Sequence, residues 1–436
     1  MQTSQLSVSL ARCILIQTYG CEENDDIAML TLWRPTKRWP RLIYLLALFV
    51  SVCLNISLFL VKVTQRVSDA NHHSSYEYTH GHNQQPRSSA RQTLIVSYMR
   101  SGSTLTGDIL QQHRDVFYVF EPLFTVDRLV KYYLPAVYLD KPSRLKRLEA
   151  SPLVSTIEDV LRCKFADMDV LTLHQHHMDK SHSTRDYLKC AQNSTLLHFH
   201  KMCLSDLVSR CLGSKHVVVK SIRMDMSMTG QLLKQLPNLK VIHLIRDPRA
   251  TILSRVQLGL AQMKILNLNI DVMKQQAQKS PQHCDQVKND LDEAYRLRKE
   301  FPGRVAILLY EKIVQSPVSM AEQLYKFLGM KITKEIKQYV FNITNGGMAD
   351  TCAVCTIRKN ASVTAFKWRT QISLPIAQMI DRACANVYSD LGYVPISAES
   401  QILNESFLTW RERYVPGMLT NVHASLSNAA FQIYSI

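Results

Sequence analysis

Residues 97–110, SYMRSGSTLTGDIL, decide the fold class of this 436-residue chain. They combine the end of an apolar strand, a turn of small residues and the start of a helix, which is how phosphate-binding loops are built. Gly102 and Gly107 have the spacing of the nucleoside-triphosphate signature G-x-x-x-x-G-K-[ST], but Asp108 stands where that signature has lysine. The loop is therefore expected to hold an anion other than the phosphates of ATP, and a P-loop kinase is disfavoured.

Apolar runs alternate with helical stretches in the chain around this loop. Five runs are apolar without alternation, which is typical of a parallel sheet covered on both faces. They are 93–98, 116–120, 216–222, 240–245 and 304–310. Asp247-Pro248 and Ser316-Pro317 are helix-start signals, and Gly329 is a helix-stop signal. The pattern predicts an α/β fold, a three-layer P-loop-like arrangement with a central parallel sheet.

The composition is basic. The chain has 52 Lys+Arg against 36 Asp+Glu, a formal net charge of +16. Such an excess suits a polyanionic partner, which could be nucleic acid, anionic lipid or acidic polysaccharide. No run of Lys and Arg is interleaved with aromatic residues, so a nucleic-acid partner is not expected.

Residues 42–61, LIYLLALFVSVCLNISLFLV, are 20 residues without a charge, about the length that crosses a bilayer core. Basic residues cluster before this segment, so the positive-inside rule places the amino terminus in the cytosol. A cleaved signal peptide is disfavoured, because 41 residues precede the apolar run. The sequence thus predicts a cytosolic tail (1–41), a transmembrane signal-anchor helix (42–61), a stem (62–90) and a lumenal domain (91–436).

Eight cysteines follow the apolar segment, and an even number permits complete pairing in an oxidising compartment. Their connectivity is not readable from the sequence. Cys352 and Cys355 form a C-x-x-C without a second one, so structural disulfides are favoured over a zinc site or a redox pair. The eight are Cys163, Cys190, Cys203, Cys211, Cys284, Cys352, Cys355 and Cys384. Glycosylation sequons, usable only in a lumenal chain, lie at Asn193, Asn342, Asn360 and Asn404.

Two expected strand ends carry unusual chemistry, and ligands of such sheets sit at the carboxyl ends of strands. At the first, small residues let backbone N–H groups close on an anion, and the helix that follows adds its positive end. At the second, HLIRDPRATILSR (243–255), Arg246 ends a strand and Ser254 lies two turns along the next helix. An arginine fork with a hydroxyl suits phosphate. Two separated anion sites predict a ligand with phosphates at both ends.

With these motifs the chain resembles the Golgi carbohydrate sulfotransferases that act on the 6-hydroxyl of galactose, N-acetylgalactosamine or N-acetylglucosamine. The similarity covers most of residues 91–393, and the block DVFYVFEPLF is most similar to the keratan sulfate galactose and chondroitin 6-O enzymes. Thr104-Leu105 replace the family's Ser-Phe, and residues 150–215 and those after 393 match poorly. The matching blocks are SYMRSGST (97–104), DVFYVFEPL (115–123), VVVKSIRM (217–224), LIRDPRATILSR (244–255), LLYEKIVQSP (308–317) and residues 366–393.

The resemblance implies 3'-phosphoadenosine 5'-phosphosulfate as the donor and no metal requirement. It places Arg100 beside the bridging oxygen, and Arg246 with Ser254 on the 3'-phosphate. It also suggests that Arg358 grips the 3'-phosphate, although the sequon at Asn360 conflicts with a buried phosphate there. The residues expected to hold the 5'-phosphate are Ser101, Gly102, Ser103 and Thr104.

Two further side chains at strand ends are candidates for the transfer step. Glu121, beside Pro122, is the candidate base for the sugar hydroxyl, and the alternative is a structural glutamate paired with Arg100 or another cation. Lys220 is expected to contact the transferring sulfonate, against the alternative of a surface or structural lysine. Arg223 is a weaker candidate than Lys220 for contact with the sulfonate.

Other kinds of site and protein fit the sequence less well. The histidine-rich segment 173–182 fits no standard zinc spacing, so a polar loop is favoured. A type II glycosyltransferase would use a D-x-D, which Asp167 and Asp169 provide by pattern, but it leaves the Arg100 and Arg246 motifs unexplained. A non-enzymatic glycan-binding membrane protein would also suit the charge. The expected protein is a single-pass type II Golgi membrane enzyme with a glycan or glycosaminoglycan acceptor, and a homodimer is left open.

Overall fold

The computed structural model describes residues 90–138, 151–192, 197–262, 270–346, 356–404 and 406–419. The expected tail, membrane helix and stem up to residue 89 lie outside these ranges, as do Cys352, Cys355 and Asn193. None of the helices within these ranges is both long enough and apolar enough to span a bilayer. The predictions for the amino-terminal segments and for the C-x-x-C stay predictions.

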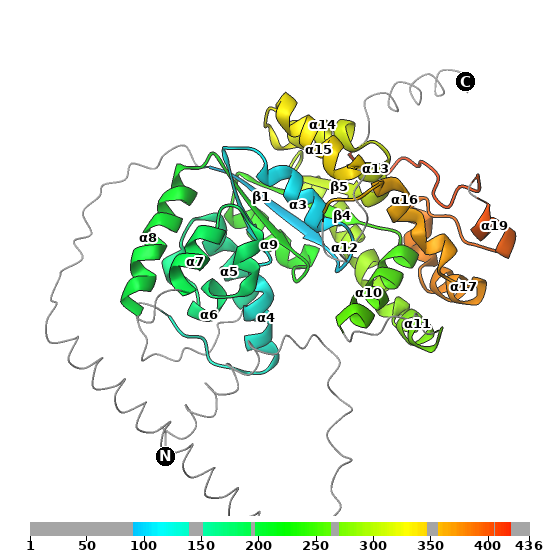
Figure 1. Ribbon diagram of the computed structural model, residues 1–436, viewed down its shortest axis with the longest axis horizontal. Helices are drawn as coiled ribbons and strands as arrows, with labels where there is room; N and C mark the ends of the chain where they lie inside the picture. The colour runs from blue at the N-terminus through cyan, green and yellow to red at the C-terminus, as the bar shows by residue number, and fades with distance from the viewer. Residues whose placement is uncertain are drawn as a thin grey trace, which may run out of the picture. The chain divides into compact units, whose positions relative to one another are not determined.

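A single five-stranded parallel sheet forms the centre of the described domain (Figure 1). The strand order is β2-β3-β1-β4-β5, and each neighbouring pair is parallel. This confirms the predicted sheet, with every strand boundary within two residues of its expected place. The strands are β1 (Arg91–Ser97), β2 (Val116–Phe120), β3 (His216–Ser221), β4 (Leu239–Ile245) and β5 (Val305–Leu309).

Both faces of the sheet are buried, as the continuous apolar runs predicted. Along β4, Val241 and Ile245 belong to one core while Ile242 and Leu244 belong to the other. Alternate side chains of a strand point to opposite faces, so the two cores lie on the two sides of the sheet. The first contains residues of α5 (Pro152–Leu161), α9 (Met226–Gln235), α10 (Pro248–Gln262), α12 (Ser280–Glu300) and α17 (Leu374–Ala383). The second contains residues of α3 (Ser103–Gln111), α13 (Tyr310–Gln315), α14 (Pro317–Leu328), α15 (Lys334–Asn345) and α16 (Ala361–Phe366).

The local helix signals also appear where they were expected. Helix α10 begins at Pro248, and α14 begins at Pro317 after the N-cap Ser316. Gly329 ends α14 in the left-handed conformation, with φ 71°. The other helices are α4 (Leu123–Lys131), α6 (Val170–Leu173), α7 (Arg185–Gln192), α8 (Leu197–Gly213), α11 (Ile270–Ala277), α18 (Ala385–Leu391), α19 (Glu399–Leu403) and the 3-10 helices η1 (Phe165–Asp167), η2 (His176–Lys180) and η3 (Lys367–Thr370).

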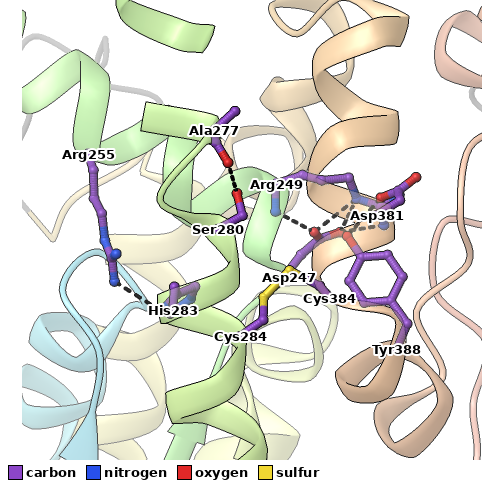
Figure 2. The surroundings of a disulfide bond; sticks show 10 residues. All are labelled: Asp247, Arg249, Arg255, Ala277, Ser280, His283, Cys284, Asp381, Cys384 and Tyr388. Atoms are coloured by element: carbon purple, nitrogen blue, oxygen red, sulfur yellow. Dashed lines mark hydrogen bonds and ion pairs between the residues drawn. A yellow bond between two sulfur atoms is a disulfide. The ribbon is translucent and has the colours of Figure 1, made fainter. Parts of the chain in front are cut away.

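Six of the eight cysteines that follow residue 61 form three disulfides, which confirms a structural role for them. Two lie within the helical segment between β2 and β3, Cys163–Cys211 and Cys190–Cys203. The third, Cys284–Cys384, ties α12 to the residue that follows α17 (Figure 2). The pairing decides a connectivity that the sequence left open.

The segments 173–183 and 415–419 cover the two edges of the sheet. On the β2 edge, Tyr118 N donates to Ser183 Oγ at 2.9 Å and Phe120 N to Ser181 Oγ at 3.0 Å. On the β5 edge, Ile307 N donates to Gly417 O and Leu419 N to Ile307 O, both at 2.9 Å. Unpaired edges are templates for association with other chains, so this cover protects the sheet. The polar loop expected over 173–182 is instead mostly helical, and its 3-10 helix η2 packs between β2 and α7.

Candidate functional site

The predicted site residues come together at the carboxyl ends of four neighbouring strands. Register pairs Ser97 of β1 with Leu244 of β4, and Phe120 of β2 with Lys220 of β3. Parallel strands end at one edge of the sheet, so the segments that follow them converge there. The loop after β1, Glu121 after β2, Lys220 near the end of β3 and Arg246 after β4 therefore surround one region.

The loop between β1 and α3 contains two residues in the left-handed backbone region. Gly102 is the N-cap of α3 and has φ 90°, while Arg100 has φ 71°. A Cβ atom on Gly102 would lie 2.1 Å from Cδ2 of Tyr310, so glycine is required both for the backbone angle and for space. The first turn of α3 holds no acidic residue, which leaves the positive helix end available to an anion.

Arg100, Ser254 and Arg246 form one hydrogen-bonded cluster. Arg100 Nε donates to Ser254 Oγ at 2.9 Å, and Arg246 Nη1 donates to the Arg100 carbonyl at 3.0 Å. The two strand ends expected to hold anions therefore lie next to each other, and their binding of two phosphates stays a prediction. The reason is the strand order, since β1 and β4 are neighbours and bring the loop and α10 side by side.

Two buried polar atoms in this cluster test whether a polyanionic donor fits. Ser101 Oγ and Arg246 Nε are buried and have no hydrogen-bond partner among the described residues. Arg246 also stacks on Tyr310, with its guanidinium carbon 4.6 Å from the ring centroid. Buried polar groups normally have partners. A phosphate has several acceptor oxygens, so the cluster fits a phosphate-containing donor.

Arg358 lies on the segment that leads into α16. Its Nη1 donates to Ile357 O at 3.1 Å, and the link from this region to the cluster is Arg246 Nη2 donating to Ala365 O at 3.4 Å. Asn360 is exposed and caps α16 by accepting from Val363 N at 3.0 Å. Binding of the donor by Arg358 and glycosylation of Asn360 both stay predictions.

Glu121 is the centre of a buried ion-pair cluster. Its Oε1 lies 2.6 Å from Lys220 Nζ and accepts from Ile222 N at 3.0 Å, while Oε2 accepts from Arg223 Nη1 at 2.9 Å. The Glu121 side chain is 2% exposed and that of Lys220 is 5% exposed. Burial lowers the pKa of Lys220, and the Glu121 carboxylate opposes that shift. The contacts are those of a glutamate that pairs cations, and its role as a base stays a prediction.

The structure adds aromatic and histidine side chains that the sequence analysis missed. Rings of His177 and Phe124 lie 4.5 Å apart, and Lys220 Nζ lies 4.4 Å from the Phe120 ring centroid. Burial lowers the pKa of His177 to about 2, with further lowering by His176 and nearby cations. The imidazole of His177 is therefore neutral beside the Lys220 cluster. No periodic signal in 173–182 pointed to this neighbourhood, because it depends on η2 packing against β2.

The D-x-D that a glycosyltransferase would use ends at Asp169, and this aspartate has a structural role. Asp169 caps α6, with Oδ2 accepting from Thr172 N and Oδ1 accepting from Val137 N, both at 2.8 Å. Asp167 ends the 3-10 helix η1 rather than a strand. Within the described ranges, no group of three His, Cys, Asp or Glu side chains is placed to hold a metal ion.

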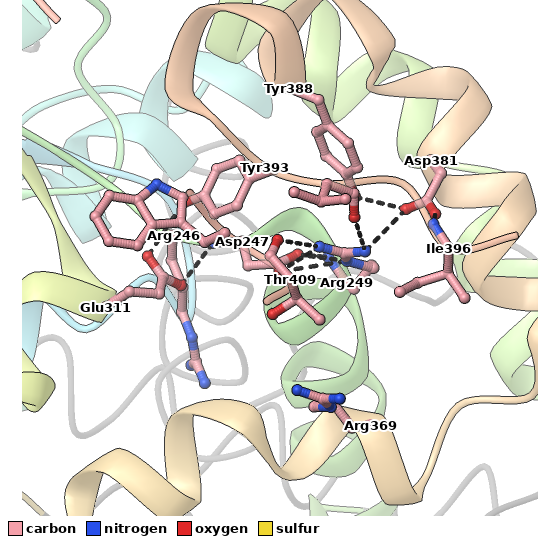
Figure 3. Close-up of polar contacts among 12 residues, drawn as sticks. Arg246, Asp247, Arg249, Glu311, Arg369, Asp381, Tyr388, Tyr393, Ile396 and Thr409 are labelled. Atoms are coloured by element: carbon pink, nitrogen blue, oxygen red, sulfur yellow. Dashed lines mark hydrogen bonds and ion pairs between the residues drawn. The ribbon is translucent and has the colours of Figure 1, made fainter. Parts of the chain in front are cut away.

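Two buried networks hold the segments of the candidate site. Under the loop, Tyr98 donates to Asp290 Oδ2 at 2.8 Å and lies 2.8 Å from His243 Nε2. Behind Arg246, the fully buried Arg249 donates to Asp247 at 2.8 Å and lies 3.4 Å from Asp381 (Figure 3). These contacts fix the backbone from which Arg100 and Arg246 project.

Glu311 anchors the turn after β4 and carries a pH dependence that can be measured. It accepts from Asp247 N at 2.9 Å and from Tyr393 Oη at 3.0 Å. Burial raises the pKa of Glu311 to about 7, so the folded protein binds this proton more tightly than the unfolded chain. Its contribution to stability is full below the ordinary glutamate pKa and is lost as pH rises through about 7. Relative to wild type, Glu311→Gln should gain about 1–3 kcal/mol in the free energy of unfolding between pH 5 and pH 8.

Urea unfolding at four pH values between 5 and 8 measures this difference. Glu399→Gln, which changes an exposed glutamate in α19, is the matched control and should follow wild type. Parallel curves for wild type and Glu311→Gln would show that Glu311 does not take up a proton on folding.

Comparison with known proteins relates the sequence of this chain to sulfotransferases. A model described as "Sulfotransferase family" matches residues 93–334. Carbohydrate sulfotransferase 1 of Rattus norvegicus is 25% identical over 73% of this chain and 83% of its own length. Carbohydrate sulfotransferase 4 of Mus musculus is 26% identical over 74% of this chain and 87% of its own length, and carbohydrate sulfotransferase 3 of Homo sapiens is 23% identical over 74% and 71%. Among solved structures, a mouse sulfotransferase complexed with PAP aligns with TM-score 0.36 and 11% identity, over 69% of this chain and 85% of its own.

Proposed function

The chain belongs to the sulfotransferase family, and from that premise we propose that it transfers a sulfonate group from 3'-phosphoadenosine 5'-phosphosulfate to a hydroxyl of a sugar in a glycan. The observation that carries the proposal is the hydrogen-bonded cluster of Arg100, Arg246 and Ser254. Arg246 Nε in this cluster and Ser101 Oγ beside it are buried and have no partner among the described residues. Relatives named carbohydrate sulfotransferases support a sugar as the acceptor. We further propose the 6-hydroxyl of galactose, N-acetylgalactosamine or N-acetylglucosamine as the accepting group.

The loop and α10 supply the contacts to the donor. Ser101 Oγ and the backbone at the start of α3 are directed to the 5'-phosphate, since a helix N-terminus favours an anion. Arg246 and Ser254 are directed to the 3'-phosphate, to which the unpaired Arg246 Nε and the Ser254 hydroxyl would donate. When bound, the donor supplies an activated sulfonate on a phosphate leaving group.

Transfer forms a bond from the sugar oxygen to sulfur and breaks the bond from sulfur to the bridging oxygen of the donor. The electron pair of the broken bond goes to the phosphate, whose growing charge Arg100 neutralises. Lys220, held by Glu121 2.6 Å away, presents a second cation at the end of β3. The sugar hydroxyl proton leaves to a base, for which Glu121 is the proposed residue. Most of the catalysis is positioning and charge neutralisation, as in phosphoryl transfer.

A lumenal location is proposed together with the activity. We propose a single-pass type II Golgi membrane protein anchored by residues 42–61, with the described domain in the lumen. Three disulfides suit an oxidising compartment. The sequons at Asn342, Asn360 and Asn404 are exposed. A shift in electrophoretic mobility on enzymatic deglycosylation would support this placement, and an unmodified chain with reduced cysteines would contradict it.

The activity is tested with full-length protein in detergent, labelled donor and EDTA. The acceptors are chondroitin, desulfated keratan sulfate, N-acetyllactosamine and an N-acetylglucosamine-terminated glycan. Transfer to one of them is the expected result and also names the acceptor. Absence of both transfer and binding of 3',5'-adenosine bisphosphate would overturn the proposal. A parallel assay with nucleotide sugars and Mn²⁺ tests the glycosyltransferase alternative.

A further inference from the structure

The first two residues of α13 form a wall behind the proposed donor site. The Tyr310 ring centroid lies 4.6 Å from the guanidinium carbon of Arg246, and the same ring leaves no space for a Cβ atom on Gly102. Glu311, the next residue, accepts from Asp247 N at 2.9 Å and so holds the residue that follows Arg246. Helix α13 therefore contacts both the loop after β1 and the turn after β4.

The carboxyl group of Glu311 has partners that fit both its ionised and its protonated form (Figure 3). Glu311 is 1% exposed. Its Oε1 accepts from the Asp247 N–H, and its Oε2 lies 3.0 Å from the hydroxyl oxygen of Tyr393. A hydroxyl can donate to a carboxylate and can accept from a protonated carboxyl group. Gain or loss of one proton at Oε2 therefore needs no rearrangement of these contacts.

The charges nearest to Glu311 act on it in opposite directions. Burial is the largest cause of the rise in the pKa of Glu311 to about 7, the Asp247 carboxylate adds to the rise, and Arg246 opposes it. Strand β5 and helix α16, which also pack against α13, contain no ionisable residue. The other charged or titratable groups on neighbouring elements have partners of their own or are exposed. They are Arg100 on Ser254, Arg249 and Tyr388 on Asp381, Lys312 on Glu412, Glu322 on Lys337, Tyr325 on the Ile109 carbonyl, and the exposed Lys326.

From this arrangement we propose that Glu311 is a positioning residue of the donor site, and that its protonation and the binding of a phosphate group by Arg246 favour each other. This inference rests on the proposed sulfotransferase function and adds a pH dependence to donor binding. An ionised Glu311 offsets part of the positive charge that Arg246 presents to the phosphate, whereas a neutral carboxyl group does not. Couplings between two binding events are reciprocal, so a phosphate on Arg246 cancels its opposition to the proton on Glu311. The donor therefore binds more tightly below about pH 7 than above it.

The test titrates full-length protein with 3',5'-adenosine bisphosphate between pH 6 and pH 8 and compares wild type with Glu311→Gln. Phosphate groups themselves titrate near pH 6, so the ratio of the two dissociation constants is compared at each pH. Across this range wild type is expected to lose about fivefold in affinity relative to Glu311→Gln, which corresponds to a coupling of about one pKa unit. Glu399→Gln, which changes an exposed glutamate, is the matched control and should follow wild type.

Calorimetry of the same titration at pH 7, in two buffers of different ionisation enthalpy, counts the protons taken up. Wild type is expected to take up a larger fraction of a proton per bound nucleotide than Glu311→Gln. A purely structural role for Glu311 would instead change the affinity by the same factor at every pH.

A second variant keeps the test decisive if Glu311→Gln is unstable. Tyr393→Phe removes the hydroxyl that donates to the ionised carboxylate, so the midpoint of the pH dependence is expected to move upward. Equal proton uptake by wild type and Glu311→Gln, or an unmoved midpoint in Tyr393→Phe, would overturn the proposal. Absence of nucleotide binding by folded wild type at every pH would instead reject the proposed function, and this inference with it.

Discussion

Replacing Arg100 with alanine is expected to lower kcat for sulfonate transfer by about 10²–10³-fold while the protein stays folded. The guanidinium projects from the loop after β1 and donates to Ser254 Oγ at 2.9 Å. It is the cation nearest to the unpaired Ser101 Oγ in sequence, where the leaving phosphate is proposed to lie. The hydrogen bond from Arg246 ends on the Arg100 carbonyl, which alanine retains, so the loop keeps its tie to β4.

The measurement is single-turnover transfer from labelled donor, with nucleotide affinity determined separately by titration. Arg100→Lys is the matched control, because it keeps the charge but loses the planar fork, and an intermediate rate is expected. Ser254→Ala removes one hydrogen-bond partner of Arg100 and should have a smaller effect on kcat. Unchanged turnover in Arg100→Ala would remove Arg100 from the mechanism.

Replacing Glu121 with glutamine is expected to lower the free energy of unfolding by about 3–5 kcal/mol. The substitution leaves the ammonium of Lys220, 5% exposed, without its carboxylate partner at 2.6 Å. Burial already lowers the pKa of Lys220, and loss of the opposing charge lowers it further. The free energy of unfolding falls because a buried cation without a partner has lost its hydration. This cost is larger than the cost of removing the cation and the carboxylate together.

Denaturant unfolding of Glu121→Gln, Lys220→Met and the double variant measures this coupling in a double-mutant cycle. The double variant should recover much of the stability lost by the single changes. Glu322→Gln, which breaks an ion pair between side chains that are both 39% exposed, should cost less than about 1 kcal/mol. Additive losses in the cycle would contradict a coupled buried pair.

The Glu121→Gln variant also distinguishes a catalytic base at Glu121 from a glutamate that only pairs cations. If its carboxylate accepts the hydroxyl proton, the rate of single-turnover transfer falls in the folded variant while the affinity for the nucleotide is kept. If it only organises Lys220 and Arg223, the stability falls while the folded fraction keeps most of its transfer rate.

The sheet and the donor loop were predictable because their signals are local. Continuous apolar runs at 93–98 and 240–245 report burial on both faces, which needs no knowledge of the partner strands. Gly102 and the residues around it report a turn that only small side chains can form. Parallel strand ends converge by geometry, so Arg100, Glu121, Lys220 and Arg246 could be placed at one edge of the sheet without coordinates.

The partners of each side chain depended on tertiary structure. Strand order brings α10 beside the loop and makes Arg100 and Ser254 neighbours 154 residues apart. Packing of η2 against β2 places His177 beside Phe124. Of the many possible cysteine pairings, the folded chain forms three disulfides. Hydrogen bonds, ion pairs and disulfides act over a few ångströms between residues distant in sequence. The sequence by itself therefore determined the fold class and the segments that carry the functional residues. Only the tertiary structure decided which side chains contact one another.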